Sequence, residues 1–480
     1  MLKSKNIKWR FLQSPASLSA GEGPDNYRER ARLLFLIPYF LFSSCSVTQQ
    51  ISKQANTILI LDSVISKGHI GISIYEPATN TYWYNYQAEK YFVPASNTKL
   101  FSLYAGMKYL GDSLIGLRYE IQNNRLNIIG TGDPTFLHPD FKYQPVFGFL
   151  KKSSNVSYSL EGAITDFKPF GFGWSWDDYI SSDAAERSEM PMYGNVAKFY
   201  MRADTVAVIP FTFYNSSIQW NNTILKNGVG PWFDIVRPFE NNEFHALNST
   251  LRYKEKQKFS SQLIPFKTIL NSTNDFKNRT FIKLLEDTLH KKVGNWSYVD
   301  ATPILKYVIH SQPVDSLFTL MMHRSDNFFA EQTLLMTSNQ LLGYMSDRKI
   351  IDTLLKTDLK DIPQKPRWVD GSGLSRYNLF TPQDFIYILQ KLKNDFGFER
   401  LKIILPTGGT GTLSSLYKND SGYIFAKTGT LSNHVALSGF LITKKNKFLI
   451  FSILPGNFIG SATPVRKAIE KFLSYIRQRY

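Results

Sequence analysis

The chain has 480 residues, of which 43% are hydrophobic and 15% aromatic, so it can bury one large core or two to three smaller ones and is not intrinsically disordered. Its single cysteine excludes a disulfide framework and any cysteine-rich zinc or iron–sulfur site. The formal charge of +17 is compatible with an anionic polymer or surface as a partner, and equally with a merely basic surface.

The N-terminal stretch has the organisation of a targeting signal. A basic segment, 28–32, precedes the unbroken apolar run 33–42, and Cys45 follows two serines. As a helix the apolar run would rise about 15 Å, half of a hydrocarbon core, so it does not span a membrane. The stretch resembles a bacterial lipoprotein signal, which predicts that 1–45 is a signal segment and that lipidated Cys45 tethers the mature protein. An ordinary signal peptide is the alternative.

Predicted elements then follow in chain order. Alternating β-branched and aromatic residues at 69–76 and 81–86 predict a hairpin, and apolar residues at helical spacing predict a helix from Ser96 to Gly111. Further elements are expected as a hairpin at 118–130, helices within 301–345 and at 382–393 and 463–477, and strands near 422–428, 434–443 and 447–454.

These elements indicate an α+β architecture. The early strands can pair with the late ones in a single antiparallel sheet flanked by helices. The stretch from about 131 to 290 differs, with short strands, many aromatic residues and weak helical periodicity. We therefore predict one domain from 46–115 and 300–480, with a large, mostly β insert at 116–299.

The first chemical motif is Ser96-Asn97-Thr98-Lys99, at the start of a predicted helix. Residues at i and i+3 share a helix face, which places the Lys99 amine within reach of the Ser96 hydroxyl. A lysine whose pKa is lowered by burial or by another cation can activate a serine as a nucleophile. A helix start with a solvated lysine is the simpler reading of this motif alone.

The second motif, Ser325-Asp326-Asn327, lies between two apolar helical stretches. Its hydroxyl could relay a proton, and its amide could hold a substrate peptide group. An N-cap explains the same residues without any chemistry.

The third motif is Lys427-Thr428-Gly429, followed by Thr430, in the strand-like run 423–431. A glycine on a strand lets another backbone approach closely, and a lysine beside a hydroxyl suits a carboxylate. An edge-strand lysine near a bulge is the alternative.

Together, in this order, the three motifs resemble those of the D-alanyl-D-alanine carboxypeptidase/endopeptidase family, the class C low-molecular-mass penicillin-binding proteins. The likeness runs over roughly 65–475. The 229 positions between Ser96 and Ser325 also fit a family with a long insert. Supporting matches are Gly130 to Pro134, Gly173 to Asp178 and Asp370 to Ser375. The resemblance implies a β-lactamase/transpeptidase-like fold and a serine peptidase acting on peptidoglycan stem peptides and binding β-lactams.

The resemblance also implies a role for each site residue. Ser96 would be the nucleophile, Lys99 the base, with its pKa lowered by Lys427, and Ser325 the proton relay. Residues expected to bind substrate are Asn327, Lys427, Thr428, Gly429, Thr430 and Asp166. The backbone N–H groups of Ser96 and Thr430 would form the oxyanion hole, and Asp166 would recognise the free end of a diaminopimelate side chain. No metal or other cofactor is needed, and the expected location is periplasmic, at the outer membrane of a Gram-negative bacterium.

Two other functions stay open at this point. A β-lactamase on the same fold is one, although the insert is far longer than in compact β-lactamases. A lipid-anchored cell-wall binder without activity is the other, although all three motifs are intact. Nucleic-acid binding has no supporting motif.

Overall fold

A computed structural model describes residues 47–153, 157–161, 165–202, 205–216, 233–248, 261–269, 280–297 and 305–480. The chain divides into two compact units, Met1–Gln50 and Ile51–Tyr480. The predicted signal segment and Cys45 lie outside the described residues. The architecture below is that of the second unit.

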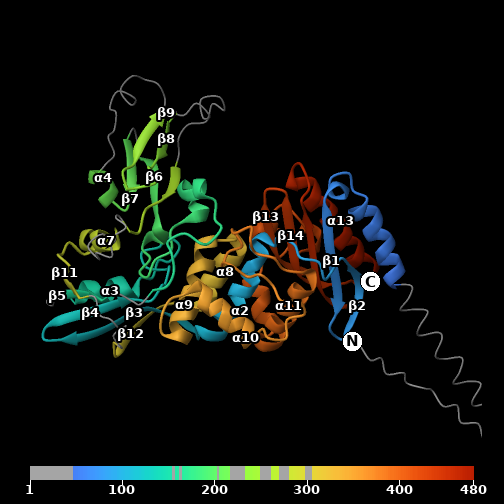
Figure 1. The fold of residues 1–480 in the computed structure, drawn as a ribbon, viewed down its shortest axis with the longest axis horizontal. Coiled ribbons are helices and arrows are strands. Elements are labelled where there is room, and N and C mark those ends of the chain that lie inside the picture. The colour runs from blue at the N-terminus through green and yellow to red at the C-terminus, as the bar shows by residue number, and fades with distance from the viewer. Residues whose placement is uncertain are drawn as a thin grey trace, which may run out of the picture. The chain divides into compact units, whose positions relative to one another are not determined.

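A five-stranded antiparallel sheet joins the two ends of this unit, in the order β13-β14-β15-β1-β2 (Figure 1). Its strands are β1 (His69–Glu76), β2 (Thr81–Tyr86), β13 (Ile424–Leu431), β14 (His434–Ile442) and β15 (Phe448–Gly456). Strand β1 pairs with β15 in a register that sets Ser73 opposite Ser452. The predicted pairing of early with late strands is therefore confirmed.

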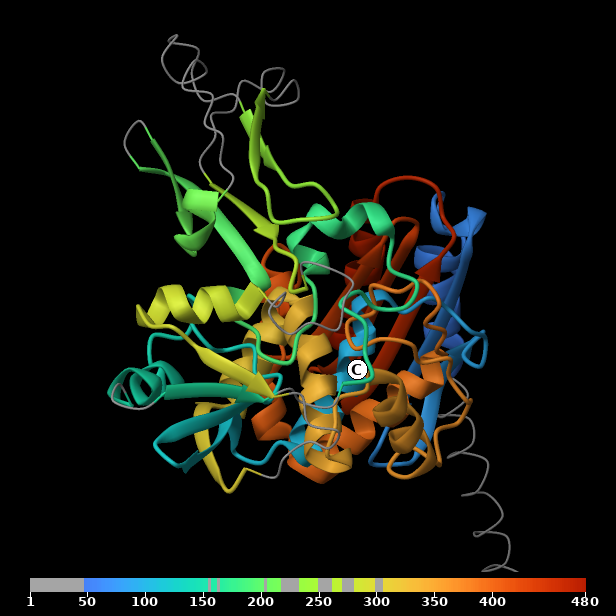
Figure 2. The same ribbon diagram turned by 60° about the vertical axis from the view of Figure 1, so that its left-hand side comes forward.

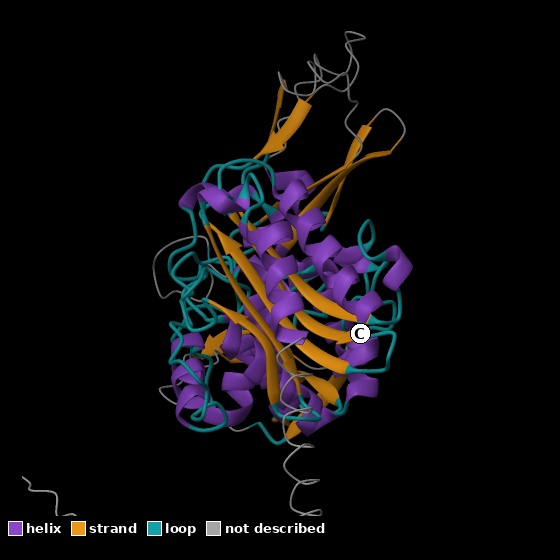
Figure 3. Cartoon of the chain, turned by 90° about the vertical axis from the view of Figure 1, so that its right-hand side faces the viewer, coloured by secondary structure: helices purple, strands orange, loops and turns teal. Residues whose placement is uncertain are grey.

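Helices cover both faces of this sheet (Figures 1 and 3). Helix α13 (Ala462–Arg479) packs on β14, and α11 (Pro382–Phe396) packs on β15 and β1 from the other side. Next to α11 lies α2 (Lys99–Tyr109), whose residues Lys99 to Met107 are all buried. The short helical turn η3 (Ala95–Thr98) leads into α2, and Gly111, at φ +70°, follows its end as predicted.

The predicted helical region 301–345 is helical only in its second part. Strand β12 (Tyr307–Pro313) comes first and pairs with β3, because Tyr307, Val308 and Ile309 suit a pleated surface better than a helix. The helical prediction is wrong for 307–313. In that second part lie α8 (Val314–Arg324) and α9 (Asn327–Leu342). Further along the chain follow α10 (Asp347–Lys356) and α12 (Phe398–Ile404).

Between α2 and α8 the regular elements of the described chain are mostly strands, which form three further sheets, ordered β11-β5-β4-β3-β12, β10-β6-β7 and β8-β9. Their strands are β3 (Ser113–Gln122), β4 (Arg125–Gly130), β5 (Ser157–Glu161), β6 (Val196–Arg202), β7 (Thr205–Ile209), β8 (Phe233–Val236), β9 (His245–Asn248), β10 (Ser261–Pro265) and β11 (Gly294–Ser297). The helices of this part are α3 (Pro145–Lys152), α4 (Thr212–Ser216) and α7 (Thr280–Leu289). Helices α8 and α9 lie between these strands and the five-stranded sheet (Figure 2).

The interior includes buried residues of α13 against one face of the five-stranded sheet and two further, separate groups of buried apolar side chains. One gathers residues of α2, α8, α9 and α11 with the five-stranded sheet, and the other gathers residues of β3, β4, β6, β7 and α7. The helix that follows Ser96 belongs to the first group, so the site described next rests on the larger helical core.

Candidate active site

Ser96 lies where three backbone segments approach one another closely. It sits in η3 directly after Ala95, which has a φ of +48°. A Cβ on Gly373 would lie 1.9 Å from the Ala95 carbonyl oxygen, and one on Gly429 would lie 2.7 Å from the Pro94 oxygen and 3.0 Å from the Ser96 nitrogen. Only glycine leaves room at these two positions, so β13 and the 370–375 loop can hold Ser96 from two sides.

Lys99 is fully buried and its amine reaches three oxygen atoms. The Nζ atom donates to Ser96 Oγ at 2.9 Å, to Asn327 Oδ1 at 2.6 Å and to the Ser372 carbonyl at 2.8 Å. The two carbonyl-type oxygens can only accept, whereas a serine hydroxyl can both donate and accept. When Lys99 loses a proton, the free lone pair must therefore face Ser96.

Burial lowers the pKa of Lys99 to about 8. It is the largest cause, and nearby carboxylates, first Asp370 and then Asp326, oppose it. The predicted cause, the charge of Lys427, is not the leading one. Burial also lowers the pKa of Lys427 well below its usual range, with the like charge of Lys99 adding to the effect.

Ser325 and Lys427 form a second hydroxyl–amine pair in the same cleft. Helix α8 ends at Arg324, Ser325 takes the left-handed conformation at φ +60°, and Asp326 caps α9 through the Phe329 N–H at 3.0 Å. The motif is thus a turn between helices, as predicted, and Asp326 is the N-cap residue of α9. Lys427 Nζ donates to Ser325 Oγ at 2.8 Å and to the Thr428 carbonyl at 2.6 Å.

The two asparagines of the motifs tie these pairs together. Asn327 accepts from Lys99 and donates from Nδ2 to the Asp183 carbonyl at 2.9 Å. The buried amide of Asn97 lies 2.7 Å from both the Lys427 carbonyl and Ser438 Oγ, so it links the nucleophile turn to β13 and β14. All three motifs therefore converge on one place in the fold.

A cleft of about 390 Å³ opens at this place. Predicted residues that line it are Ser96, Ser325, Asn327, Thr428 and Thr430. Lys99 and Lys427 have no exposed surface and lie behind its wall, while the backbone of Gly429 passes beside Ser96. The hydroxyl and amide groups needed for acyl transfer thus face one opening, and the two amines lie directly behind them.

The cleft also contains residues that the motifs did not predict. Additional lining residues are Asp183, Arg324, Gly373, Leu374, Thr412, Leu431 and Arg466. Gly373 and Leu374 belong to a supporting match noted above, so the sequence held a signal for them. Arg466, which donates to Thr430 Oγ1 at 2.5 Å, had none, because it reaches the cleft only through the packing of α13 on the sheet.

Asp166 lies in a different place. Its backbone N–H donates to the Met345 carbonyl at 2.8 Å, and its Oδ2 accepts from Ser346 Oγ at 3.2 Å. It lines a second pocket, of about 930 Å³, together with Arg187, Asp347 and other residues, and is not among those that line the Ser96 cleft. Its predicted role in recognition of a diaminopimelate end stays a prediction.

The described ranges hold no group of three or more His, Cys, Asp or Glu side chains placed to share a metal ion. Within the same ranges, no helix has the length and apolar character needed to cross a bilayer.

Comparison with known proteins places this geometry in a family. Residues 54–479 match the D-Ala-D-Ala carboxypeptidase 3 (S13) family. Among curated proteins, the chain is 30% identical over 115 residues to penicillin-sensitive carboxypeptidase A of Dictyostelium discoideum, covering 22% of each. It is 28% identical over 182 residues to carboxypeptidase DacB of Mycolicibacterium smegmatis, covering 35% of this chain and 38% of that protein. These alignments thus span well under half the length of either relative.

Among solved structures, penicillin binding protein 4 from Haemophilus influenzae superposes with a TM-score of 0.67 at 18% identity, covering 89% of this chain and 99% of that one. A second structure of that protein, complexed with a β-lactam, gives a TM-score of 0.64 at 17% identity. At this identity the likeness shows the fold. The predicted α+β, penicillin-binding-protein-like fold is confirmed.

Proposed function

The chain belongs to the D-Ala-D-Ala carboxypeptidase 3 (S13) family, and on this basis we propose that it is a serine-type D-Ala-D-Ala carboxypeptidase or endopeptidase acting on peptidoglycan peptides. One observation carries the proposal: the Lys99 amine lies 2.9 Å from Ser96 Oγ, with its other two contacts taken by oxygens that can only accept. Of the three groups in contact with the neutral amine, only the Ser96 hydroxyl carries a proton that the amine can accept.

The proposed reaction has two halves. Ser96 Oγ attacks the carbonyl carbon of the scissile amide and its proton passes to Lys99. The C–N bond then breaks as the leaving amine takes up a proton. This is the proton that Lys99 received, and Ser325 is assigned as its relay. Water attacks the resulting ester on Ser96 and gives a proton to Lys99. The bond from the acyl carbon to Ser96 Oγ breaks, and Lys99 returns that proton to Oγ as the acid product leaves.

The oxyanion hole is assigned to the backbone N–H groups of Ser96 and Thr430. The Ser96 nitrogen lies beside Gly429 on β13, and the absent Cβ at Gly429 keeps that side open. Fixed backbone donors of this kind stabilise the tetrahedral intermediate without reorganisation.

Substrate contacts are assigned to both edges of the cleft. Asn327 is assigned to the acyl-side amide. Lys427 and Thr428 are assigned to the terminal carboxylate, Lys427 through its charge and its contact with Ser325. Arg466, which contacts Thr430 Oγ1, adds a cation on the same side. Asp166 would meet only a substrate that extends into the second pocket.

The location of the enzyme is part of the proposal. A family that acts on the cell wall fits the predicted signal segment, and we assign a periplasmic location with lipidated Cys45 as the anchor. Metabolic labelling with a fatty-acid analogue should mark the wild-type chain and not Cys45→Ala. Equal labelling of both chains would remove the anchor from the proposal.

Covalent labelling by a fluorescent penicillin tests the chemistry. We expect stable labelling of the wild-type protein, none of Ser96→Ala, and full labelling of Ser66→Ala, which alters an exposed serine outside the three motifs. Labelling that survives in Ser96→Ala would contradict the acyl-enzyme. Rapid turnover of a chromogenic cephalosporin would favour a β-lactamase, and no labelling of the folded wild type would favour a non-catalytic wall binder.

Mass spectrometry of digested muropeptides then separates the two activities. Loss of a single alanine from monomers indicates a carboxypeptidase, and cleavage of crosslinked dimers indicates an endopeptidase. Absence of both reactions with a penicillin-reactive protein would point to a different acyl substrate.

A further inference from the structure

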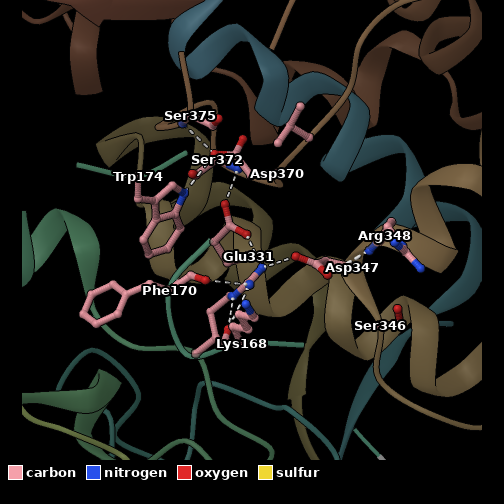
Figure 4. A network of polar contacts seen from close by, with 12 residues as sticks. Lys168, Phe170, Trp174, Glu331, Ser346, Asp347, Arg348, Asp370, Ser372 and Ser375 are labelled. Carbon is pink, nitrogen blue, oxygen red and sulfur yellow. Dashed lines mark hydrogen bonds and ion pairs between the residues drawn. The ribbon is translucent and has the colours of Figure 1, made fainter. Parts of the chain in front are cut away.

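A fully buried arginine from the insert is connected to the candidate active site through two intervening residues. Arg187 belongs to the chain segment that separates the first two motifs, and its side chain is 1% exposed. Its Nη1 atom lies 3.2 Å from Glu331 Oε2 and 2.6 Å from Asp347 Oδ2 (Figure 4). A guanidinium held between two carboxylates in the interior fixes both of them in place.

Glu331 connects this arginine to the base. While Oε2 faces Arg187, Oε1 accepts the backbone N–H of Ser372 at 2.8 Å. The carbonyl of the same Ser372 accepts from Lys99 Nζ at 2.8 Å. Three contacts thus lead from Arg187 through Glu331 and Ser372 to the amine that faces Ser96.

The insert also contacts the loop 370–375 through a second residue, Trp174. Arg187 donates to the carbonyls of Lys168 at 2.9 Å and Phe170 at 3.4 Å, and its guanidinium lies 5.7 Å from the ring centre of Trp174. Trp174 Nε1 donates to Asp370 Oδ2 at 3.0 Å (Figure 4). Asp370 in turn accepts the N–H groups of Gly373 at 2.8 Å and Ser375 at 2.7 Å, so loop 370–375 is held at both ends.

The ionisation of Glu331 and that of Lys99 depend on each other and on nearby charges. Burial and then the charge of Asp370 raise the pKa of Glu331, and with Arg187 opposing both it lies at about 7. The negative charge of Glu331 in turn raises the pKa of Lys99. Charged groups that act on Lys99 are Asp370, Asp326, Glu331, Asp183 and Lys427, and those that act on Glu331 are Asp370, Arg187 and Asp347.

We propose that Arg187 and Glu331 are positioning residues for Lys99: the insert arginine fixes Glu331, Glu331 fixes the backbone of Ser372 through its N–H, and the carbonyl of Ser372 aims the lysine at Ser96. The inference rests on the proposed function, since it assigns a task only to a catalytic Lys99. It gives the insert a part in the acylation step itself, in addition to any part in substrate recognition.

Acylation kinetics with a fluorescent penicillin test the proposal. In Arg187→Met, which keeps bulk and removes the charge, the second-order acylation rate constant should fall about 10- to 100-fold, as for outer residues that orient a reactive group. Arg187→Lys restores a cation and should recover part of that loss. Both are measured well below the unfolding midpoint of each variant.

The matched control is Arg237→Met. Arg237 is also a buried arginine of the insert, but among the described residues its guanidinium donates to backbone carbonyls, those of Pro265, Pro238, Asn241 and Tyr179. Arg237→Met therefore shows the effect of general damage to the insert while the contacts of Arg187 stay intact. We expect near-wild-type acylation from this control at temperatures where it is folded.

A pH profile separates positioning from stability. Glu331→Gln keeps an oxygen for the Ser372 N–H and removes the negative charge, so the acid limb of acylation should move to lower pH. The shift should be on the order of half a unit, below the 1–3 units that a directly contacting charge gives. A purely structural glutamate would leave this limb unchanged.

The outcomes separate the inference from the proposed function. If the folded wild type is not acylated at Ser96, the proposed function fails and the inference falls with it. If the wild type is acylated but Arg187→Met matches Arg237→Met and the Glu331→Gln profile does not move, only the inference is wrong. If Arg187→Met does not fold, Arg187→Lys and Glu331→Gln decide by the same two criteria.

Discussion

At the scale of single residues, the chemistry depends on which oxygens surround one amine. Lys99 contacts Ser96 Oγ, Asn327 Oδ1 and the Ser372 carbonyl, and two of these three cannot donate a proton. Burial keeps its pKa at about 8, so the amine can switch between protonated and neutral forms near neutral pH. That combination makes a lysine suitable as a base without a histidine in the contact set.

This lysine predicts the pH dependence of acylation. The neutral amine is the reactive form, and its fraction grows about tenfold per pH unit until pH approaches the pKa. We therefore expect the acylation rate constant to rise with pH up to about 8, the pKa of Lys99, and to level off above it. Stopped-flow labelling between pH 6 and 9 measures this, with tryptophan fluorescence as the control for folding. A flat profile would mean that Lys99 is not the proton acceptor.

The sequence predicted the members of the site better than their partners. Ser96 and Lys99 could be paired because the i to i+3 spacing of a helical turn fixes their separation. The contact of Lys99 with the Ser372 carbonyl joins residues 273 positions apart, and no local spacing encodes it. The same holds for Arg466, which enters the cleft from the last helix of the chain.

At the scale of elements, one strand must pass very close to one helical turn. Strand β13 brings Gly429 beside the backbone of Pro94, Ser96 and Asn97, where a Cβ would lie 2.7 to 3.1 Å from their atoms. The turn continues into α2, whose residues from Lys99 to Met107 are buried. If a side chain were added at Gly429, we therefore expect the strand to move and not the turn.

Gly429→Ala should therefore disable the site more than it destabilises the fold. The added methyl moves β13 away from the Ser96 nitrogen, and misplacement on this scale costs on the order of 100-fold in rate. Overpacking of this kind costs about 1–3 kcal/mol of unfolding free energy. Penicillin acylation and chemical denaturation measure the two effects.

Gly148→Ala is the matched control. Gly148 lies in α3 and a Cβ there meets nothing within 4 Å, so we expect unchanged acylation and a gain of about 0.5–1 kcal/mol in helix stability. If Gly429→Ala acylated as fast as Gly148→Ala, the close approach would have no catalytic importance.

The sequence also predicted strands and helices unevenly. The hairpin at 69–86 and the three late strands were found because alternation and turn residues are local signals. The segment 307–313 fell within a predicted helical region because it adjoins the helical spacing of α8, and only its pairing with β3 reveals the strand. Tertiary pairing decided the element where local preference was ambiguous.

At the scale of the whole molecule, two apolar cores stabilise different parts of the chain. Leu389 of α11 belongs to the core beneath the active site, and Leu284 of α7 belongs to the core of the insert, and both are fully buried. Because the two groups are separate, a cavity in one should weaken mainly its own part.

Leu284→Ala and Leu389→Ala form a matched pair that tests this. Each should cost about 2–5 kcal/mol, and calorimetry should show each variant lowering a different unfolding transition. A single transition that moves equally in both variants would show that the insert and the catalytic part unfold as one unit.

The antiparallel sheet also has a consequence for synthesis. One neighbour of β1 is β2, which follows at once, but the other is β15, which begins only at Phe448. While the ribosome is still translating the middle of the chain, one edge of β1 has no hydrogen-bond partner, and such an edge attracts foreign strands. Lys427, too, is added only near the end. A nascent polypeptide therefore carries Ser96 and Lys99 for most of its elongation without the strand that completes their cleft, and a ribosome that stalls before Ile424 releases a product that is both inert and prone to aggregate.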